Sequence, residues 1–242
     1  MPKKTATRQP APIASTFQIV EAYKTARTNL LFALSTSENK VVAISSAEPN
    51  AGKSTSAANL AITMAQTGAR VLLIDGDLRK PSLHKTFRLN RANGLSMILS
   101  GLLPLEECIC REVAKNLDFI PSGSIPPNPS ELLGSPTMDR LLEDVSKKYD
   151  YIFLDMPPLG VVSDALIAGS KTAGIVLVCR QRQTTYEELQ NAVDSIAEVG
   201  ENLLGVVVTN IRRDAHAYGS YSKYRYYKYY NYSYTADSSE TD

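Results

Sequence analysis

Residues 43–55 read AISSAEPNAGKST and lead from a short apolar run into an amphipathic stretch. Within them, Ala47-x-x-x-x-Gly52-Lys53-Ser54 fits a tolerant form of the Walker A loop. Such a loop aims backbone N–H groups at phosphate oxygens from a helix N-terminus; Gly52 permits close approach, Lys53 neutralises phosphate charge and Ser54 can ligate Mg²⁺. An accidental turn is the alternative, but the flanking patterns agree on a phosphate site. The predicted nucleotide-contacting residues here are Ala47, Glu48, Pro49, Asn50, Ala51, Gly52, Lys53, Ser54 and Thr55.

Short apolar runs alternate with amphipathic stretches from Val41 to about Thr209. This alternation is typical of parallel strands joined by crossover helices. Several runs are almost continuously apolar, as expected where helices cover both faces of the sheet. The sequence therefore predicts a doubly wound α/β fold with a mostly parallel sheet. The expected strands are 41–45, 70–75, 117–121, 151–155, 175–179 and 203–209, and helices are expected from about residue 16, over 53–67, around 138–145 and around 189–196.

The composition is that of an ordinary globular protein with one main domain: 242 residues, 43% hydrophobic and 21% charged, with a net charge of +1. The near balance of charge gives no bulk argument for binding nucleic acid. No apolar run approaches the length of a membrane span, and no secretory signal is seen, so we expect a cytoplasmic chain. We expect a disordered arm over 1–15, a P-loop domain over 16–211 and a flexible tail over 212–242.

Three aspartates follow apolar runs at expected strand ends, where ligand sites of open α/β sheets form. Asp75 and Asp77 lie in LLIDGDLRKP, two residues apart, so that an extended chain would point them the same way. Asp155 ends YIFLD in the manner of a Walker B carboxylate. Carboxylates beside a nucleotide can hold Mg²⁺ or accept a proton from a hydroxyl, although each could instead cap a helix or turn.

The end of the chain is crowded with tyrosine. Nine of the thirteen tyrosines lie within residues 218–234, among Ser, Lys, Arg and Gly and without aliphatic partners. A sticky edge or adhesive segment is one interpretation, but an accessible phosphoacceptor segment suits this composition better. The candidate phosphoacceptors are Tyr218, Tyr221, Tyr224, Tyr226, Tyr227, Tyr229, Tyr230, Tyr232 and Tyr234.

The order AEPNAGKST, LLIDGDLRKP, YIFLDMPP resembles the Walker A, A′ and B motifs of bacterial tyrosine kinases of capsule and exopolysaccharide systems. The resemblance extends to SGSIPPNPSELL at 122–133, to Asp164 and to the tyrosine-rich end. It implies an ATP- and Mg²⁺-dependent tyrosine kinase that autophosphorylates its tail between subunits. In such an enzyme Lys53 and Ser54 contact phosphate and Mg²⁺, Asp155 acts on the metal, and Asp75 or Asp77 supports the metal and activates the tyrosine hydroxyl. Which aspartate is the base stays open.

Two further sets of residues take their meaning from this resemblance. Asn210 follows the last expected strand, where related ATPases place an adenine-contacting Asn, although a turn residue is the alternative. No Asn-Lys-x-Asp guanine motif is present, which favours ATP. Glu21, Lys24 and Arg27 match the spacing of a family element that docks on a neighbouring subunit in a ring, with Lys in place of the middle Arg. An internal salt-bridge ladder on one helix face is the alternative.

The resemblance also implies partners. The separate-chain form of such kinases is activated at the inner face of the membrane by the cytoplasmic tail of a membrane-embedded modulator. A homo-oligomeric ring and a protein-tyrosine phosphatase are expected too, and nucleic acid is not. The main alternative is a non-kinase P-loop switch ATPase of the septum-positioning or chromosome-partitioning type. Those proteins carry a lysine early in the Walker A loop, where this chain has Glu48.

Overall fold

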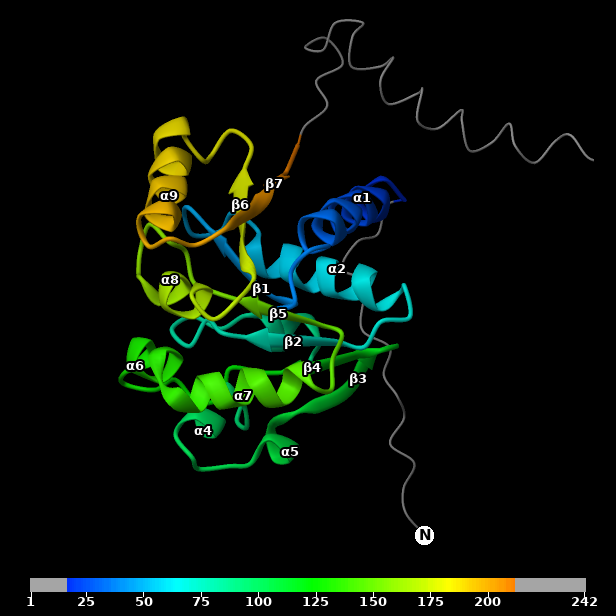
Figure 1. Ribbon diagram of the computed structural model, residues 1–242, viewed down its shortest axis with the longest axis vertical. Helices are drawn as coiled ribbons and strands as arrows, with labels where there is room; N and C mark the ends of the chain where they lie inside the picture. Colours follow the sequence, from blue (N-terminus) through cyan, green and yellow to red (C-terminus); the bar gives the residue numbers. More distant parts are fainter. Residues whose placement is uncertain (1–16, 212–242) are drawn as a thin grey trace, which may run out of the picture. The chain divides into compact units, whose positions relative to one another are not determined.

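The computed structural model describes residues 17–211 and contains one seven-stranded sheet (Figure 1). The strand order is β3-β4-β2-β5-β1-β6-β7, and all neighbours are parallel except β3 and β4. The predicted doubly wound, mostly parallel fold is confirmed. The strands are β1 (Val41–Ser46), β2 (Val71–Asp75), β3 (Cys110–Ala114), β4 (Leu117–Ile120), β5 (Tyr151–Asp155), β6 (Gly174–Arg180) and β7 (Leu203–Thr209).

Helices cover both faces of the sheet, which explains why the central strands are apolar along their whole length. Every residue of β1 and β2 is buried. On one face α1 and α2 pack against the sheet, and on the other face α7 and α8 do so (Figure 1). The helices are α1 (Phe17–Ala33), α2 (Lys53–Ala65), α3 (Leu83–Thr86), α4 (Leu95–Leu99), α5 (Leu105–Cys108), α6 (Pro129–Gly134), α7 (Pro136–Ser146), α8 (Asp164–Gly169) and α9 (Tyr186–Glu198).

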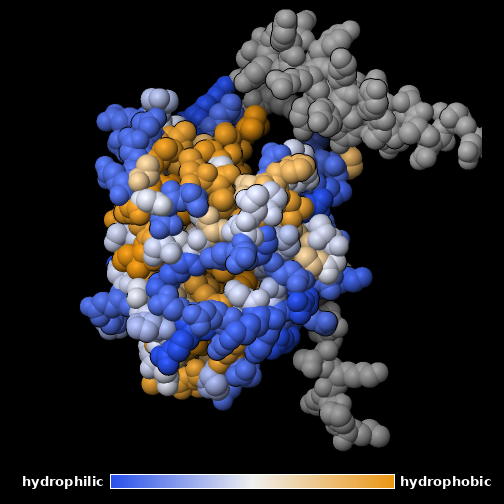
Figure 2. Space-filling view, in the orientation of Figure 1, coloured by the Kyte–Doolittle hydropathy of each residue, from blue (hydrophilic) through white to orange (hydrophobic). Residues whose placement is uncertain are grey.

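The two edge strands, β3 and β7, differ in their pairing direction. The strand β3 was not predicted from the sequence; it pairs with β4 in the antiparallel direction, and no residue along it is fully buried. At the other edge, β7 leaves Val206 and Val208 exposed at 43% and 47%. On the face drawn in Figure 2, apolar residues gather between α9 and α1, over this edge of the sheet. None of the helices within residues 17–211 has the length and apolar content needed to cross a bilayer.

The register of the parallel strands brings the sequence motifs together. In the pairing of β2 with β5, Asp75 lies opposite Asp155, and Ile44 of β1 lies opposite Asp155 on the other side. The loop that leaves β1 therefore begins at the same carboxyl edge as both aspartates. This edge is where a ligand site is expected.

Candidate functional site

The loop between β1 and α2 has the predicted strand–loop–helix context. It spans residues 47–52, and α2 starts at Lys53, so that Lys53 and Ser54 lie in the first helical turn. Asn50 and Gly52 adopt left-handed backbone angles, with φ of 64° and 98°. Glycine takes such angles without strain and asparagine tolerates them better than most residues. The loop thus folds back on itself just before a helix N-terminus, which is the shape that presents amide groups to an anion.

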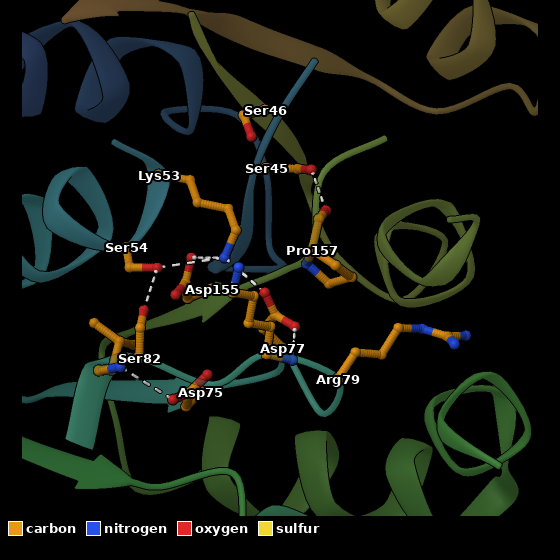
Figure 3. A network of polar contacts seen from close by, with 12 residues as sticks. Ser45, Ser46, Lys53, Ser54, Asp75, Asp77, Arg79, Ser82, Asp155 and Pro157 are labelled. Atoms are coloured by element: carbon orange, nitrogen blue, oxygen red, sulfur yellow. Dashed lines mark hydrogen bonds and ion pairs between the residues drawn. The ribbon is translucent and has the colours of Figure 1, made fainter. Parts of the chain in front are cut away.

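Lys53 points from α2 into a group of carboxylates at the strand ends (Figure 3). Its Nζ lies 2.9 Å from Asp77 Oδ2, 3.5 Å from Asp155 Oδ1 and 3.3 Å from Ser54 Oγ. Burial alone would lower the pKa of Lys53, but the charges of Asp155 and Asp77 outweigh it and raise the pKa. The ammonium is therefore held charged at the mouth of the loop, where a nucleotide phosphate would arrive.

Two of the aspartates are fully buried and carry acceptor atoms that are not used. Burial raises the pKa of Asp155, and burial together with the charge of Asp155 raises the pKa of Asp75 well above its usual range. Among the described residues, Asp155 Oδ2 and Asp75 Oδ1 are buried with no hydrogen-bond partner. A buried carboxylate oxygen left unsatisfied is costly unless a cation completes it. These two atoms suit a site that is finished by a bound cation.

Asp75 is the last residue of β2 and Asp77 lies in the loop after it, and the two carboxylates have different hydrogen-bond partners. Asp75 Oδ2 accepts a hydrogen bond from the N–H of Leu83 at 3.2 Å. Asp77 Oδ1 accepts from the N–H of Lys80 at 2.9 Å, while its other oxygen faces Lys53. Both side chains, which were expected to point the same way, join the same polar network (Figure 3).

Ser82 is a member of this network that the sequence did not reveal. Its hydroxyl lies 3.0 Å from the hydroxyl of Ser54, the predicted metal ligand. Ser82 precedes the one-turn helix α3, and the adjacent Leu83 N–H holds Asp75. Nothing in the residue pattern around Ser82 marks it, because only the fold brings the segment after β2 against the start of α2.

Asp164 is part of a second buried polar group beside the site. Arg79 binds it with two bonds, from Nε at 2.7 Å and from Nη2 at 2.9 Å, and Ser130 donates to it at 2.7 Å. Burial alone would raise the pKa of Asp164, but these hydrogen bonds outweigh it and lower the pKa. The group ties the loop after β2 to α6 and α8, and so fixes the loop that carries Asp77.

The residues predicted for an oligomer interface make contacts within the chain. Lys24 Nζ pairs with Glu21 on its own helix at 2.8 Å. Arg27 instead turns toward α2, where its Nη1 donates to the carbonyl of Thr63 at 2.9 Å. Tyr23 of the same helix lies 3.2 Å from Ser56 of α2, hydroxyl to hydroxyl. The helix α1 is thus attached to α2 by two polar contacts, and the internal ladder extends only from Glu21 to Lys24.

Of the predicted adenine contact and the predicted phosphoacceptors, only Asn210 lies among the residues that the structure describes. Asn210 directly follows β7 in the chain and has a left-handed φ of 54°. Its predicted contact with adenine remains a prediction. The nine candidate phosphoacceptor tyrosines from Tyr218 to Tyr234 lie outside the described residues, as does the arm over 1–15.

A loop suited to binding phosphate connects the central strand β1 to α2, and a lysine of α2 faces carboxylates at the strand ends. These features define a P-loop nucleotide-binding protein. Comparison with known proteins gives the family. A model described as an AAA domain matches residues 39–204. Tyrosine-protein kinase YwqD of Bacillus subtilis (strain 168) is 42% identical over 202 residues, which cover 83% of this chain and 85% of YwqD. The chain belongs to the family of bacterial tyrosine-protein kinases.

Solved structures agree with this assignment. The kinase domain of Escherichia coli tyrosine kinase ETK is 33% identical, with a TM-score of 0.81 over 88% of this chain and 85% of that one. Among the sequence relatives, the putative tyrosine-protein kinase in the cps region of Klebsiella pneumoniae is 39% identical over 215 residues, but this chain spans only 29% of its length. The MinC:MinD complex of Aquifex aeolicus, at 23% identity and a TM-score of 0.61, shares the fold alone.

Proposed function

We propose that this chain is an ATP-dependent protein-tyrosine kinase that phosphorylates its own C-terminal tyrosines and regulates capsular or exopolysaccharide synthesis. The observation that carries the proposal is the placement of Lys53 among Asp77 and Asp155 at the mouth of the loop. It provides a cation for the phosphates and carboxylates for a metal and a hydroxyl at one sheet edge. The names of the relatives, tyrosine-protein kinases, support the same reaction.

The residues present fit a magnesium ion. The unsatisfied Oδ2 of Asp155 is buried, and Ser54 lies in the first turn of α2. Magnesium in nucleotide sites is commonly held by one or two protein groups and completed by substrate phosphates and water. We expect Ser54 and Asp155 to hold it, with Asp75 in support. When bound, the ion offsets the negative charge of the β and γ phosphates.

The chain's own residues then have distinct roles in the transfer. The tyrosine oxygen forms a bond to the γ-phosphorus as the bond from that phosphorus to the β–γ bridging oxygen breaks, which releases ADP. The phenol proton passes to an aspartate, either Asp75 or Asp77. Lys53 stabilises the charge on the phosphates. We expect Asn210 to lie beside the adenine.

The tail is the proposed substrate, and a neighbouring subunit is its proposed enzyme. The 24 residues from Ile211 to Tyr234 can extend by about 80 Å, which is enough to reach another active site. Residues Tyr218 to Tyr234 carry a formal charge of +3 from Lys223, Arg225 and Lys228. Each phosphate adds about −1.5 to −2, so phosphorylation would make the tails repel one another. We propose that kinase activity and ring assembly alternate for this reason.

The proposed partners follow from the family. A ring of subunits would use Glu21 and Lys24, and would use Arg27 only if its bond to Thr63 is released. We propose that a membrane-embedded modulator activates the chain through its cytoplasmic tail and holds it at the inner face of the membrane. A protein-tyrosine phosphatase would reset the tail.

The test is incubation of the full chain with ATP and Mg²⁺, with the modulator tail where one is needed, followed by mass spectrometry of tail peptides. Phosphotyrosine in residues 218–234 is expected in the wild type and not in Lys53→Met. Lack of tail phosphotyrosine in the wild type, or its persistence in Lys53→Met, would refute the proposal. A chain with a Tyr→Phe tail is the control, and it should still bind ATP.

A further inference from the structure

The phosphate loop is held from outside by a set of side chains that the nucleotide chemistry does not itself explain. Each backbone carbonyl from residue 47 to residue 52 accepts a hydrogen bond. Buried or packed carbonyls need such partners, but most loops find them within their own segment or in water. Here three consecutive carbonyls, those of Pro49, Asn50 and Ala51, are held by side chains from distant parts of the sequence.

Arg180 and Thr209 are the last residues of β6 and β7, and Gln183 lies in the loop after β6. Gln183 Nε2 donates to the carbonyl of Pro49 at 3.3 Å, and Arg180 Nη1 donates to that of Asn50 at 3.1 Å. Thr209 Oγ1 donates to the carbonyl of Ala51 at 2.6 Å. We call Arg180, Gln183 and Thr209 the loop brace. They lie 130 to 158 residues away from the carbonyls that they hold.

The geometry of the peptide bond gives the brace a consequence on the other side of the loop. In a trans peptide the C=O and the N–H of the same unit point in opposite directions, and no cis peptide occurs in the described residues. Holding the carbonyls of residues 49, 50 and 51 toward the brace therefore turns the N–H groups of residues 50, 51 and 52 away from it. Successive backbone amides on one side of a loop can form an anion-binding concavity.

A fourth contact fixes the side chain at the start of the loop. Thr184 Oγ1 accepts a hydrogen bond from the N–H of Arg180 at 2.7 Å and lies 2.5 Å from Glu48 Oε1. The same short segment thus orients Arg180 and anchors Glu48. Glutamate at this position is therefore used as an acceptor within the subunit.

We propose that Arg180, Gln183 and Thr209 are positioning residues for nucleotide binding, because they hold three loop carbonyls outward and so present the amides of residues 50–52 to the phosphates. The inference rests on the proposed function in that its ligand is a nucleoside triphosphate. None of the three residues needs to touch the nucleotide. Their role is to hold the loop in its binding conformation before the ligand arrives.

Thr209 offers the sharpest test, because two substitutions separate its hydroxyl from its shape. Thr209→Val keeps the volume and loses the donor, whereas Thr209→Ser keeps the donor. Binding of the non-hydrolysable probe AMPPNP with Mg²⁺ to the full chain is measured by titration calorimetry. We expect the dissociation constant to rise about 2- to 10-fold in Thr209→Val, which is the range of one hydrogen bond, and to stay within about 2-fold in Thr209→Ser.

A second pair of variants tests the proposal in case Thr209→Val does not fold. Gln183 lies on an exposed loop, and Gln183→Leu should weaken AMPPNP binding about 2- to 5-fold. The matched control is Gln190→Leu, because within residues 17–211 the Gln190 side chain donates to Asp194 of its own helix, at 2.8 Å, and not to the loop. If Thr209→Val fails to fold, Gln183→Leu decides. Wild-type affinity in both Thr209→Val and Gln183→Leu would overturn the proposal, as would an equal loss in Thr209→Ser.

The kinase assay on the same samples separates the two proposals. If the wild type binds AMPPNP but does not phosphorylate its tail, the proposed kinase function is refuted and the proposed role of the loop brace is not. Wild type that phosphorylates its tail, together with brace variants that bind AMPPNP normally, would refute the brace alone.

Discussion

Replacement of Arg79 by leucine should destabilise the protein by leaving Asp164 buried without its main partner. Arg79 makes two charge-assisted bonds to Asp164, at 2.7 Å and 2.9 Å, and each such bond is worth about 1.5–3 kcal/mol. The Arg79 side chain is 40% exposed, so water can take its place in part. Ser130 also remains as a donor. We therefore expect about half of the gross value to be lost, roughly 1.5–3 kcal/mol, or a fall of roughly 3–12 °C in melting temperature.

The loss should depend on pH in a defined direction. In the wild type the pKa of Asp164 is lowered, so its contribution to stability is complete above the ordinary carboxyl pKa and is lost as the pH falls through the lowered value. In Arg79→Leu burial dominates and the pKa of Asp164 rises. The folded variant then gains a proton first and recovers stability as the pH falls. The difference between the two proteins should shrink between pH 7 and pH 4.

Chemical unfolding at several pH values, followed by circular dichroism, measures this difference. The matched control is Lys147→Leu, which breaks an ion pair with Asp144 of similar length, 3.0 Å, whose side chains are 71% and 63% exposed. That substitution should cost no more than about 0.5 kcal/mol. An Arg79→Leu loss as small as the control, or one that is constant from pH 7 to pH 4, would refute the reasoning.

Four other substitutions probe the fold and the site. Gly94→Ala should lower the free energy of unfolding in urea by about 3 kcal/mol or more, because the added Cβ would lie 2.1 Å from the carbonyl oxygen of Pro121. Gly68→Ala should lower it by only about 1 kcal/mol, because Gly68 has a φ of 95° but open space around it. Equal losses at the two glycines would contradict this. Thr185→Ala removes the capping box of α9 and should lower stability by about 1 kcal/mol, which thermal melts can detect. Asp155→Asn should slow tail phosphorylation by about 100-fold or more in a rate assay, and near-normal rates would exclude Asp155 from the proposed metal site.

The sequence predicted the central sheet because its strands obey simple rules. Strands buried on both faces read as continuous apolar runs, and the expected β5 agrees with the structure residue for residue. The expected β7 also agrees residue for residue, because its run is apolar although it lies at an edge. The strand β3 escaped prediction because CREVA, residues 110–114, has neither an apolar run nor a clean alternation, and lies at an edge. Helices of four to six residues, such as α3 and α4, are too short to show a helical period.

The site was predictable to the extent that its residues sit on strand ends or in a known loop. Lys53 and Asp155 meet because parallel strands end at one edge of the sheet. The partners of the loop carbonyls could not be predicted, since Gln183 and Thr209 belong to no motif and donate from distant segments. The bond from Arg27 to Thr63 of α2 was likewise not predicted, because helix packing and not helix spacing selects its partner.

Mixing two complementary chains tests most directly the claim that this protein phosphorylates its own tail between subunits. One chain is active but carries a Tyr→Phe tail, and the other is Lys53→Met with an intact tail. After incubation with ATP and Mg²⁺, mass spectrometry should find phosphotyrosine between Tyr218 and Tyr234 of the Lys53→Met chain. An unmodified Lys53→Met tail beside a phosphorylated wild-type control would contradict transfer between subunits, and an unmodified wild-type tail would contradict the kinase itself.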